Sequence, residues 1–150
     1  MPTDLIVRIT RMEKTCIYYK DGYKYQLSDN YELKIPITLE SAIDTDYVKL
    51  SVEGLLWLKR GYAWDGPSGP TFDTKSFMRA SLIHDALYQL MREGHLDPLK
   101  YRNRADVIMQ EICRIDGMSW IRSVWVYYGV HWFAAGATLK VNDRKVLQAP

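Results

Sequence analysis

Cysteine is scarce in this chain, and this limits the kinds of protein it can be. Of the 150 residues only Cys16 and Cys113 are cysteines, and they lie far apart in the sequence. A small secreted protein stabilised by disulfide bonds carries several cysteines, so that class is disfavoured and a reducing setting fits better. Neither thiol has the spacing of a metal-ligand pair.

A strong excess of one charge sign is also missing. The chain has 20 lysine and arginine residues against 18 aspartate and glutamate residues, which gives a formal net charge of +2 at pH 7. A dedicated nucleic-acid-binding protein usually carries a concentrated basic stripe that follows the phosphates. The balanced and scattered charges therefore predict no nucleic-acid partner.

The N-terminal stretch MPTDLIVRIT lacks the features of a signal peptide, and no repeat or low-complexity segment interrupts the chain. Asp4 stands where a signal peptide carries basic residues, and the apolar run after it is short. The sequence therefore predicts synthesis in the cytoplasm, without a signal peptide. With 47% hydrophobic residues, residues 1–150 are expected to form a single domain around one core.

The two parts of the chain differ in hydrophobic period. Residues 1–64 contain short runs rich in β-branched and aromatic residues, including LIVRIT, YELKIPITLE and YVKLSVEGLLWLKRGYAW. These runs predict an antiparallel β meander, with an Asp-Gly turn in KDGYKY and an edge or strand end at Pro36. Residues 65–150 hold a Gly/Pro loop and three helical patterns, so the sequence predicts an α+β fold.

The first two helical patterns predict an antiparallel pair. Apolar residues recur at helical spacing over residues 77–90, and Gly94 and Pro98 predict the end of this helix. A second helix is predicted over residues 101–115, before the turn residues DGMS. The short connection between the two favours an antiparallel arrangement.

The third pattern, SWIRSVWVYYGVHWFAAGATL, is apolar nearly all round and carries Arg122 as its only fixed charge. Its aromatic rings are spread along its length, whereas in a transmembrane helix such rings gather at the two interfaces. One interpretation is a helix of the protein core, and the other is a helix that lies in a membrane surface or in a partner's groove. The residues proposed for such contact are Trp120, Trp125, Tyr128, Trp132 and Phe133.

A histidine and its neighbours form the candidate catalytic group. On the first helix His84 and Tyr88 share a face, whereas Asp85 is turned by about 100° onto a neighbouring face. On the second helix Asp106 lies at the edge of the inward face, so an antiparallel pair would bring it beside His84. A carboxylate bonded to one imidazole nitrogen leaves the other as a base that activates water.

The loop WDGPSGP before the first helix offers a role for Asp85. Its glycines allow carbonyl groups to converge, and hard cations such as calcium bind carbonyls and carboxylates together. Asp85 and Asp65, with carbonyls from Gly66 to Gly69, would form an oxygen-only calcium site beside His84. Such an ion would polarise an ester carbonyl as the activated water attacks it.

Each of these features also has a purely structural interpretation. A lone histidine in a helix is more often a hydrogen-bonded core residue, and a Gly-Pro loop usually only reverses the chain. Asp106 has Arg102 and Arg104 as alternative partners. The chemical interpretation depends on finding the loop, the His-Asp pair, the tyrosine and the second aspartate in order along one chain.

Two resemblances coincide at these residues. The segments GYAWDGPSGPTFDT and RASLIHDALYQLMR resemble a family of small proteins of unknown function that are encoded mainly by tailed phages and prophages. The resemblance extends over the central and C-terminal parts of the chain, including the tryptophan-rich tail. It implies a viral source, with synthesis in the host and association with the virion, but no particular activity.

The second resemblance concerns chemistry. A glycine-rich loop, a helix with His-Asp-x-x-Tyr and a second helix with an aspartate are similar to the core of secreted and prokaryotic phospholipases of the A-two type. The cysteines that flank the motif in that family are missing here. The resemblance implies calcium as cofactor, with His84 as the base, Asp106 as its orienter, Tyr88 as a supporting residue, and Asp85 and Asp65 as calcium ligands.

Three functions follow as hypotheses. The first is a calcium-assisted, phospholipase-like hydrolase that cleaves lipid esters as a phage enters or lyses its host, with the aromatic helix on the membrane surface. The second is a non-enzymatic virion component, such as a tail, connector or baseplate protein, whose aromatic residues anchor other virion proteins. The third is a peptidoglycan hydrolase with a metal at His84 and Asp85, although His95 and His131 are not spaced to complete a zinc site with His84.

Overall fold

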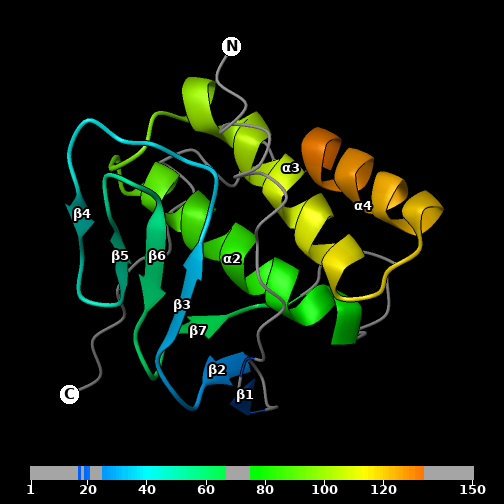
Figure 1. Ribbon diagram of the computed structural model, residues 1–150, viewed down its shortest axis with the longest axis horizontal. Helices are drawn as coiled ribbons and strands as arrows, with labels where there is room; N and C mark the ends of the chain where they lie inside the picture. Colours follow the sequence, from blue (N-terminus) through cyan, green and yellow to red (C-terminus); the bar gives the residue numbers. More distant parts are fainter. Residues whose placement is uncertain (1–16, 18, 21–24, 67–74, 134–150) are drawn as a thin grey trace, which may run out of the picture.

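The computed structural model describes residues 17, 19–20, 25–66 and 75–133. In this part of the chain a β-rich region precedes three helices, which confirms the predicted α+β fold (Figure 1). The run predicted at residues 5–10, the Asp-Gly turn at 21–22 and residues 67–74 of the Gly/Pro loop lie outside the described residues.

The described strands form two small antiparallel sheets. The first contains β1 (Tyr19–Lys20), β2 (Tyr25–Leu27) and β7 (Ala63–Trp64) in the order β1-β2-β7. The second contains β3 (Tyr31–Lys34), β4 (Ile43–Asp44), β5 (Val48–Leu50) and β6 (Leu55–Leu58) in the order β3-β6-β5-β4. These strands pair in antiparallel fashion, as predicted. Strands β4, β5 and β6 form a meander, in which strands that follow each other in the sequence are paired. Strand β3 instead pairs with β6, and β2 pairs with β7.

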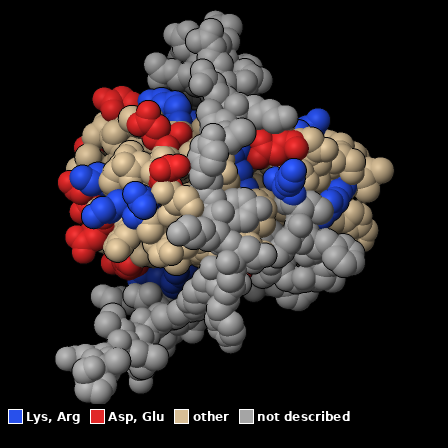
Figure 2. All heavy atoms as spheres, turned by 90° about the horizontal axis from the view of Figure 1, so that it is seen from below, with Lys and Arg blue, Asp and Glu red and all other residues tan. Residues whose placement is uncertain are grey.

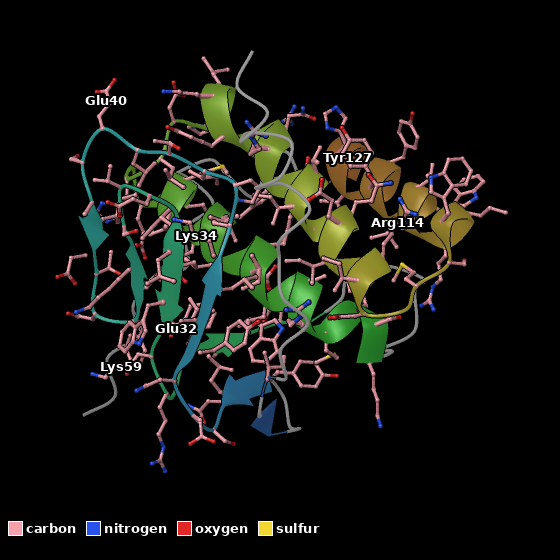
Figure 3. The ribbon with its side chains drawn as sticks, viewed as in Figure 1. Glu32, Lys34, Glu40, Lys59, Arg114 and Tyr127 are labelled. Carbon is pink, nitrogen blue, oxygen red and sulfur yellow. The ribbon has the colours of Figure 1, made fainter. Side chains whose placement is uncertain are left out.

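Strand β3 alternates as a strand with one face in the core should. Tyr31 and Leu33 are buried, whereas Glu32 and Lys34 are exposed (Figure 3). The chain then leaves the ladder before Pro36, in agreement with the predicted strand end.

A glycine allows the segment after β3 to cross the turn between β5 and β6. Gly54 has φ of 88°, and a Cβ atom there would collide with the carbonyl oxygens of Ile35 and Ile37. The Ile35 N–H donates to the Gly54 carbonyl at 2.8 Å, and the Leu39 N–H donates to that of Val52 at 3.0 Å. These hydrogen bonds hold residues 35–39 beside the β5–β6 hairpin. The preceding strand, β3, therefore lies next to β6 and pairs with it.

The helices are α2 (Lys75–Arg92), α3 (Pro98–Ile115) and α4 (Trp120–Phe133). Gly94 follows the end of α2 with φ of 82°, as predicted. The prediction that the second helix begins at residue 101 is wrong, because α3 begins at Pro98. Proline suits the first helical position, where its missing N–H is not needed, and the Asp97 side chain caps the helix by accepting the Leu99 N–H at 3.0 Å.

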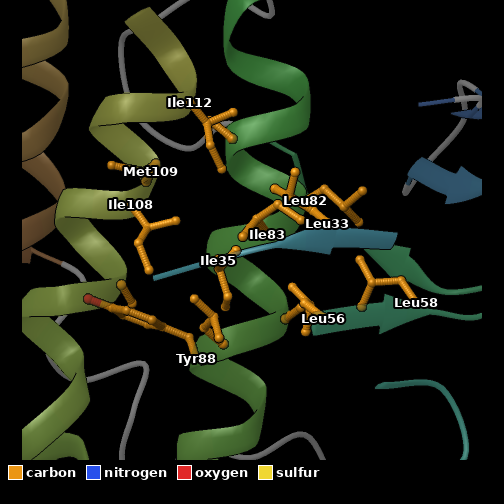
Figure 4. Close-up of a cluster of buried hydrophobic side chains, with 14 of the residues drawn as sticks. Leu33, Ile35, Leu56, Leu58, Leu82, Ile83, Tyr88, Ile108, Met109 and Ile112 are labelled. Atoms are coloured by element: carbon orange, nitrogen blue, oxygen red, sulfur yellow. The ribbon is translucent and has the colours of Figure 1, made fainter. Parts of the chain in front are cut away.

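Helix α2 occupies the centre of the molecule, between the β3-β6-β5-β4 sheet and α3, and α4 lies along the outer side of α3 (Figure 1). The core fills the space between the sheet and the α2–α3 pair (Figure 4). Its labelled side chains are Leu33, Ile35, Leu56, Leu58, Leu82, Ile83, Tyr88, Ile108, Met109 and Ile112.

The surface agrees with the balanced composition. On the face drawn in Figure 2, basic and acidic side chains are interspersed, and the end of the molecule toward α4 is largely uncharged. Among the described residues visible on this face, the basic side chains do not gather into one continuous stripe.

Candidate active site

His84 and Asp106 are in direct contact in the interior, as the antiparallel helix pair predicts. Nε2 of His84, on α2, lies 2.8 Å from Oδ1 of Asp106, on α3. The histidine is 6% exposed and the aspartate is fully buried. Because a carboxylate can only accept, the ring donates from Nε2, and in the neutral ring the lone pair is then on Nδ1.

Tyr88, one helical turn after His84, supports the same contact. Its hydroxyl donates to Oδ1 of Asp106 at 2.6 Å, and its ring centroid lies 3.9 Å from that of His84. Burial raises the pKa of the Tyr88 hydroxyl, and the neighbouring Asp106 raises it further. The hydroxyl therefore remains a donor, and the buried carboxylate receives hydrogen bonds in place of water.

Asp85 lies on the opposite side of the imidazole, where its Oδ1 is 3.9 Å from Nδ1 of His84. This distance is too long for a hydrogen bond, so the attraction is one of charge. Burial lowers the pKa of His84, but the hydrogen bond to Asp106 and the charge of Asp85 outweigh burial and raise it above 6.5. The side chain of Asp85 is 34% exposed, so it marks the edge of the site toward solvent.

A second carboxylate influences Asp85 from the start of the Gly/Pro loop. Burial is the largest cause of the raised pKa of Asp85; the charge of His84 lowers it, and that of Asp65 raises it. Asp65 is exposed and directly follows β7. The two acidic groups are therefore within electrostatic range of each other.

The predicted calcium ligands are only partly described. Asp65, Gly66 and Asp85 lie in described segments, whereas Gly69 does not. Gly66 has φ of 77°, and a Cβ atom there would collide with the ring of Tyr25, so the loop begins tightly packed on β2. Within residues 25–66 and 75–133, no three His, Cys, Asp or Glu side chains gather into a metal-binding group. Asp85 and Asp65 are the donors from this part of the chain whose chemistry suits calcium.

His131 on α4 also contacts Asp106, which was not predicted from the sequence. Its Nδ1 lies 3.3 Å from Oδ2 of Asp106, the oxygen that His84 and Tyr88 leave unused. The chain has 3 histidines, and one within an almost uncharged helix is a candidate partner for a buried carboxylate. The sequence does not show which carboxylate His131 contacts, because helical spacing gives no information about contacts between α3 and α4.

Two side chains of the β-rich part hold α2 in place on either side of His84. Nε1 of Trp64, on β7, donates to the hydroxyl of Ser81 at 3.0 Å, and the Tyr62 hydroxyl donates to Oε1 of Gln89 at 3.1 Å. The loop that follows β7 therefore begins from a position fixed against the helix that carries the histidine.

A second buried polar cluster lies toward the other end of the helix pair. Nε and Nη2 of Arg79 donate to the two carboxylate oxygens of Asp116 at 2.9 and 2.8 Å, and Nη1 donates to the Tyr31 hydroxyl at 3.1 Å. This cluster joins α2, the end of α3 and β3. The guanidinium stays charged and occupies both oxygens of the Asp116 carboxylate, which fits a structural role.

Helix α4 is buried on one side and exposed on the other. Ser123 and Val126 are buried, whereas the large side chains of Trp120, Ile121, Trp125 and Tyr128 are each more than half exposed. The backbone of Trp132 and Phe133 belongs to α4, but their side chains lie outside the described residues. Of the two interpretations, the core helix holds for the buried side of α4, and the exposed side is left available for contact with a membrane surface or a partner. Across the described parts of the chain, no helix has the length and apolarity needed to cross a membrane.

Comparison of the chain with known protein families, curated proteins and solved structures yields no match, so its function must be argued from the geometry of this site.

Proposed function

We propose that this chain is a phospholipase-like hydrolase of lipid esters, with His84 as the base and Asp106 as the residue that orients it. The main support is the 2.8 Å contact between Nε2 of His84 and Oδ1 of Asp106. This contact leaves Nδ1 as the basic nitrogen, on the side of the partly exposed Asp85. A histidine held in this way can take a proton from water.

The proposed reaction has two steps and forms no covalent bond to the protein. Nδ1 of His84 takes a proton from water while the water oxygen bonds to the ester carbonyl carbon. The tetrahedral intermediate then breaks its bond to the alcohol oxygen, and the imidazolium returns the proton to that oxygen. The products are a fatty acid and a lysolipid, and His84 returns to its starting state.

Calcium is the cofactor implied by the resemblance to phospholipases. Asp85 and Asp65 would hold it, together with backbone carbonyls from Gly66 to Gly69. When bound, the ion would supply positive charge that polarises the ester carbonyl and stabilises the oxyanion. The Asp85 carboxylate lies 3.9 Å from Nδ1 of His84, so this ligand directly adjoins the proposed base.

The proposed contact with lipid uses the exposed side of α4. Trp120, Trp125 and Tyr128 are each more than half exposed, and rings that carry a polar N–H or O–H suit the boundary between water and acyl chains. The resemblance to phage proteins supports a role as a phage enters or lyses its host, for a protein made in the host cytoplasm and carried by the virion.

The test is fatty-acid release from vesicles of phosphatidylethanolamine and phosphatidylglycerol, with calcium and with a calcium chelator. We expect release that needs calcium and falls about a thousandfold in His84→Ala and Asp106→Asn, as when a catalytic base or its partner is removed. His95→Ala is the matched control, because His95 is an exposed histidine that follows α2. Undiminished release by folded His84→Ala protein would reject the proposal.

A non-enzymatic virion component is the second candidate, and the exposed aromatic side of α4 supports it equally well. In that case the Asp106 cluster only ties the helices together. His84→Ala would then lower the melting temperature or impair virion assembly, and the wild-type chain would turn over no lipid. Capture of α4 by a purified virion protein, lost in Trp125→Ser, would favour this candidate.

A further inference from the structure

Both oxygens of the buried Asp106 carboxylate are engaged, and the second is held from a third helix. Oδ1 accepts from Nε2 of His84 and from the Tyr88 hydroxyl, while Oδ2 lies 3.3 Å from Nδ1 of His131 on α4. We propose that His131 is a positioning residue, which fixes the rotation of the Asp106 carboxylate and through it the orientation of His84. This role rests on the proposed hydrolase function.

The geometry explains why a second anchor matters. The carboxylate turns about its Cβ–Cγ bond, and this rotation would carry Oδ1 away from His84 and Tyr88, which both contact it. A donor on Oδ2 resists the same rotation from the other side of the carboxylate. Groups that act through the partner of a catalytic residue commonly change activity by about 10- to 100-fold.

The ring of His131 is itself held in place. The Tyr127 ring stacks on it with centroids 5.5 Å apart and an angle of 14° between the planes. The Tyr127 hydroxyl donates to Oδ1 of Asn103 at 2.7 Å, which connects α4 back to α3. The His131 side chain therefore lies partly at the surface, where it is 28% exposed, and its imidazole reaches from there to the buried Asp106 carboxylate.

The acceptor chemistry of Asp106 also fixes the tautomers of both histidines. Because the carboxylate only accepts, His84 must carry its hydrogen on Nε2, and a neutral His131 must carry its hydrogen on Nδ1. In model imidazoles the Nε2–H form is the more common, so an Nδ1–H form of His131 is a specific signature of this contact.

The first experiment does not depend on activity. Nitrogen-15 spectra of the histidine rings, recorded on the full chain at alkaline pH, should show His84 as the Nε2–H form and His131 as the Nδ1–H form. In His131→Phe the His84 signals should shift or broaden, whereas in His95→Phe they should not change. A wild-type His131 in the Nε2–H form, or a His84 spectrum unaffected by His131→Phe, would overturn the proposal.

The second experiment measures hydrolysis of the same vesicles. We expect His131→Phe to lower kcat about tenfold with little change in KM, since the residue acts on orientation and not on lipid binding. His131→Asn, whose amide can still donate to Asp106, should restore most of the loss. Equal loss in both folded variants would contradict positioning by a hydrogen bond.

The two experiments separate the positioning role from the proposed function. If the wild-type chain hydrolyses no lipid, the hydrolase proposal fails, and the positioning role in catalysis fails with it. The nitrogen-15 spectra then still decide whether His131 orients the carboxylate. If hydrolysis occurs and the spectra of His84 do not respond to His131→Phe, only the role of His131 is rejected.

Discussion

Arg79 and Asp116 form a buried ion pair with two parallel hydrogen bonds, Nε to Oδ2 at 2.9 Å and Nη2 to Oδ1 at 2.8 Å. The arginine lies in the second turn of α2 and the aspartate directly follows α3, so the pair fixes the two helices at one end. The contact between His84 and Asp106 lies farther along the same interface. The ion pair and the candidate site therefore lie on the same interface between α2 and α3.

Breaking the Arg79–Asp116 pair should destabilise the fold strongly. Asp116→Asn leaves a buried guanidinium without its counterion, and losses of about 3 kcal/mol are typical for such sites. Urea unfolding measures the change. Asp44→Asn is the control, because Asp44 pairs with Lys49 at 3.4 Å on the surface and should cost less than about 1 kcal/mol. Similar losses in the two variants would contradict the interpretation.

Removing the Tyr88 hydroxyl should cost more than removing a comparable hydroxyl elsewhere. The Tyr88 hydroxyl donates to a buried carboxylate, whereas the Tyr62 hydroxyl donates to the neutral amide of Gln89. Bonds to charged acceptors contribute about 1.5–3 kcal/mol and neutral ones about 1 kcal/mol. Thermal unfolding of Tyr88→Phe and Tyr62→Phe should reveal this order, and the reverse order would contradict the stronger bond from Tyr88.

Gly54→Ala should destabilise the sheet far more than Gly94→Ala. Both positions have positive φ, so each alanine carries backbone strain of about 1 kcal/mol or more. Only at Gly54 would the new Cβ also collide with carbonyl oxygens, whereas nothing lies within 4 Å of a Cβ at Gly94. Denaturant midpoints of the two variants test the difference, and equal midpoints would argue against the close crossing at Gly54.

Glu111 on α3 should make stability depend on pH. Its Oε2 is buried without a hydrogen-bond partner among the described residues, and burial raises its pKa above 4.5. The folded protein then binds this proton more tightly than the unfolded chain, so the ionised form is destabilising. The penalty is absent below about pH 4.5 and grows as the pH rises through the raised pKa.

Glu111→Gln should therefore raise the melting temperature at pH 7, and this gain should shrink as the pH falls toward 4.5. Glu53→Gln is the control, because Glu53 is exposed and should give no such trend. A gain that is independent of pH would indicate a cause other than ionisation.

Substitutions on the exposed side of α4 should weaken vesicle binding without affecting the fold. Trp125 is 74% exposed, so Trp125→Ser should change the free energy of unfolding by less than about 0.5 kcal/mol. Sedimentation with anionic vesicles should show a several-fold loss of bound protein. Wild-type protein that does not bind such vesicles would remove the proposed lipid contact and favour a protein partner for this surface.

The helix pair and its central contact could be predicted because they depend on local periodicity. Apolar spacing located the helices, and a short connection favoured an antiparallel pair, in which residues 84 and 106 face each other. Pro98 was harder to interpret, because proline is compatible both with the residues after one helix and with the first position of the next. Capping by Asp97 decides between these, and that bond is visible only in three dimensions.

The amino-acid order alone was enough to predict the α+β class, the approximate helices and the facing of His84 and Asp106, because these follow from local periodicity and from a short connection between two helices. The pairing of β3 with β6, the ion pair of Arg79 with Asp116 and the approach of His131 to Asp106 depend on how separate elements pack. Many partners are compatible with the same periodicity. Packing selects one of them, because only that arrangement buries the apolar faces while giving each of these charged groups a partner.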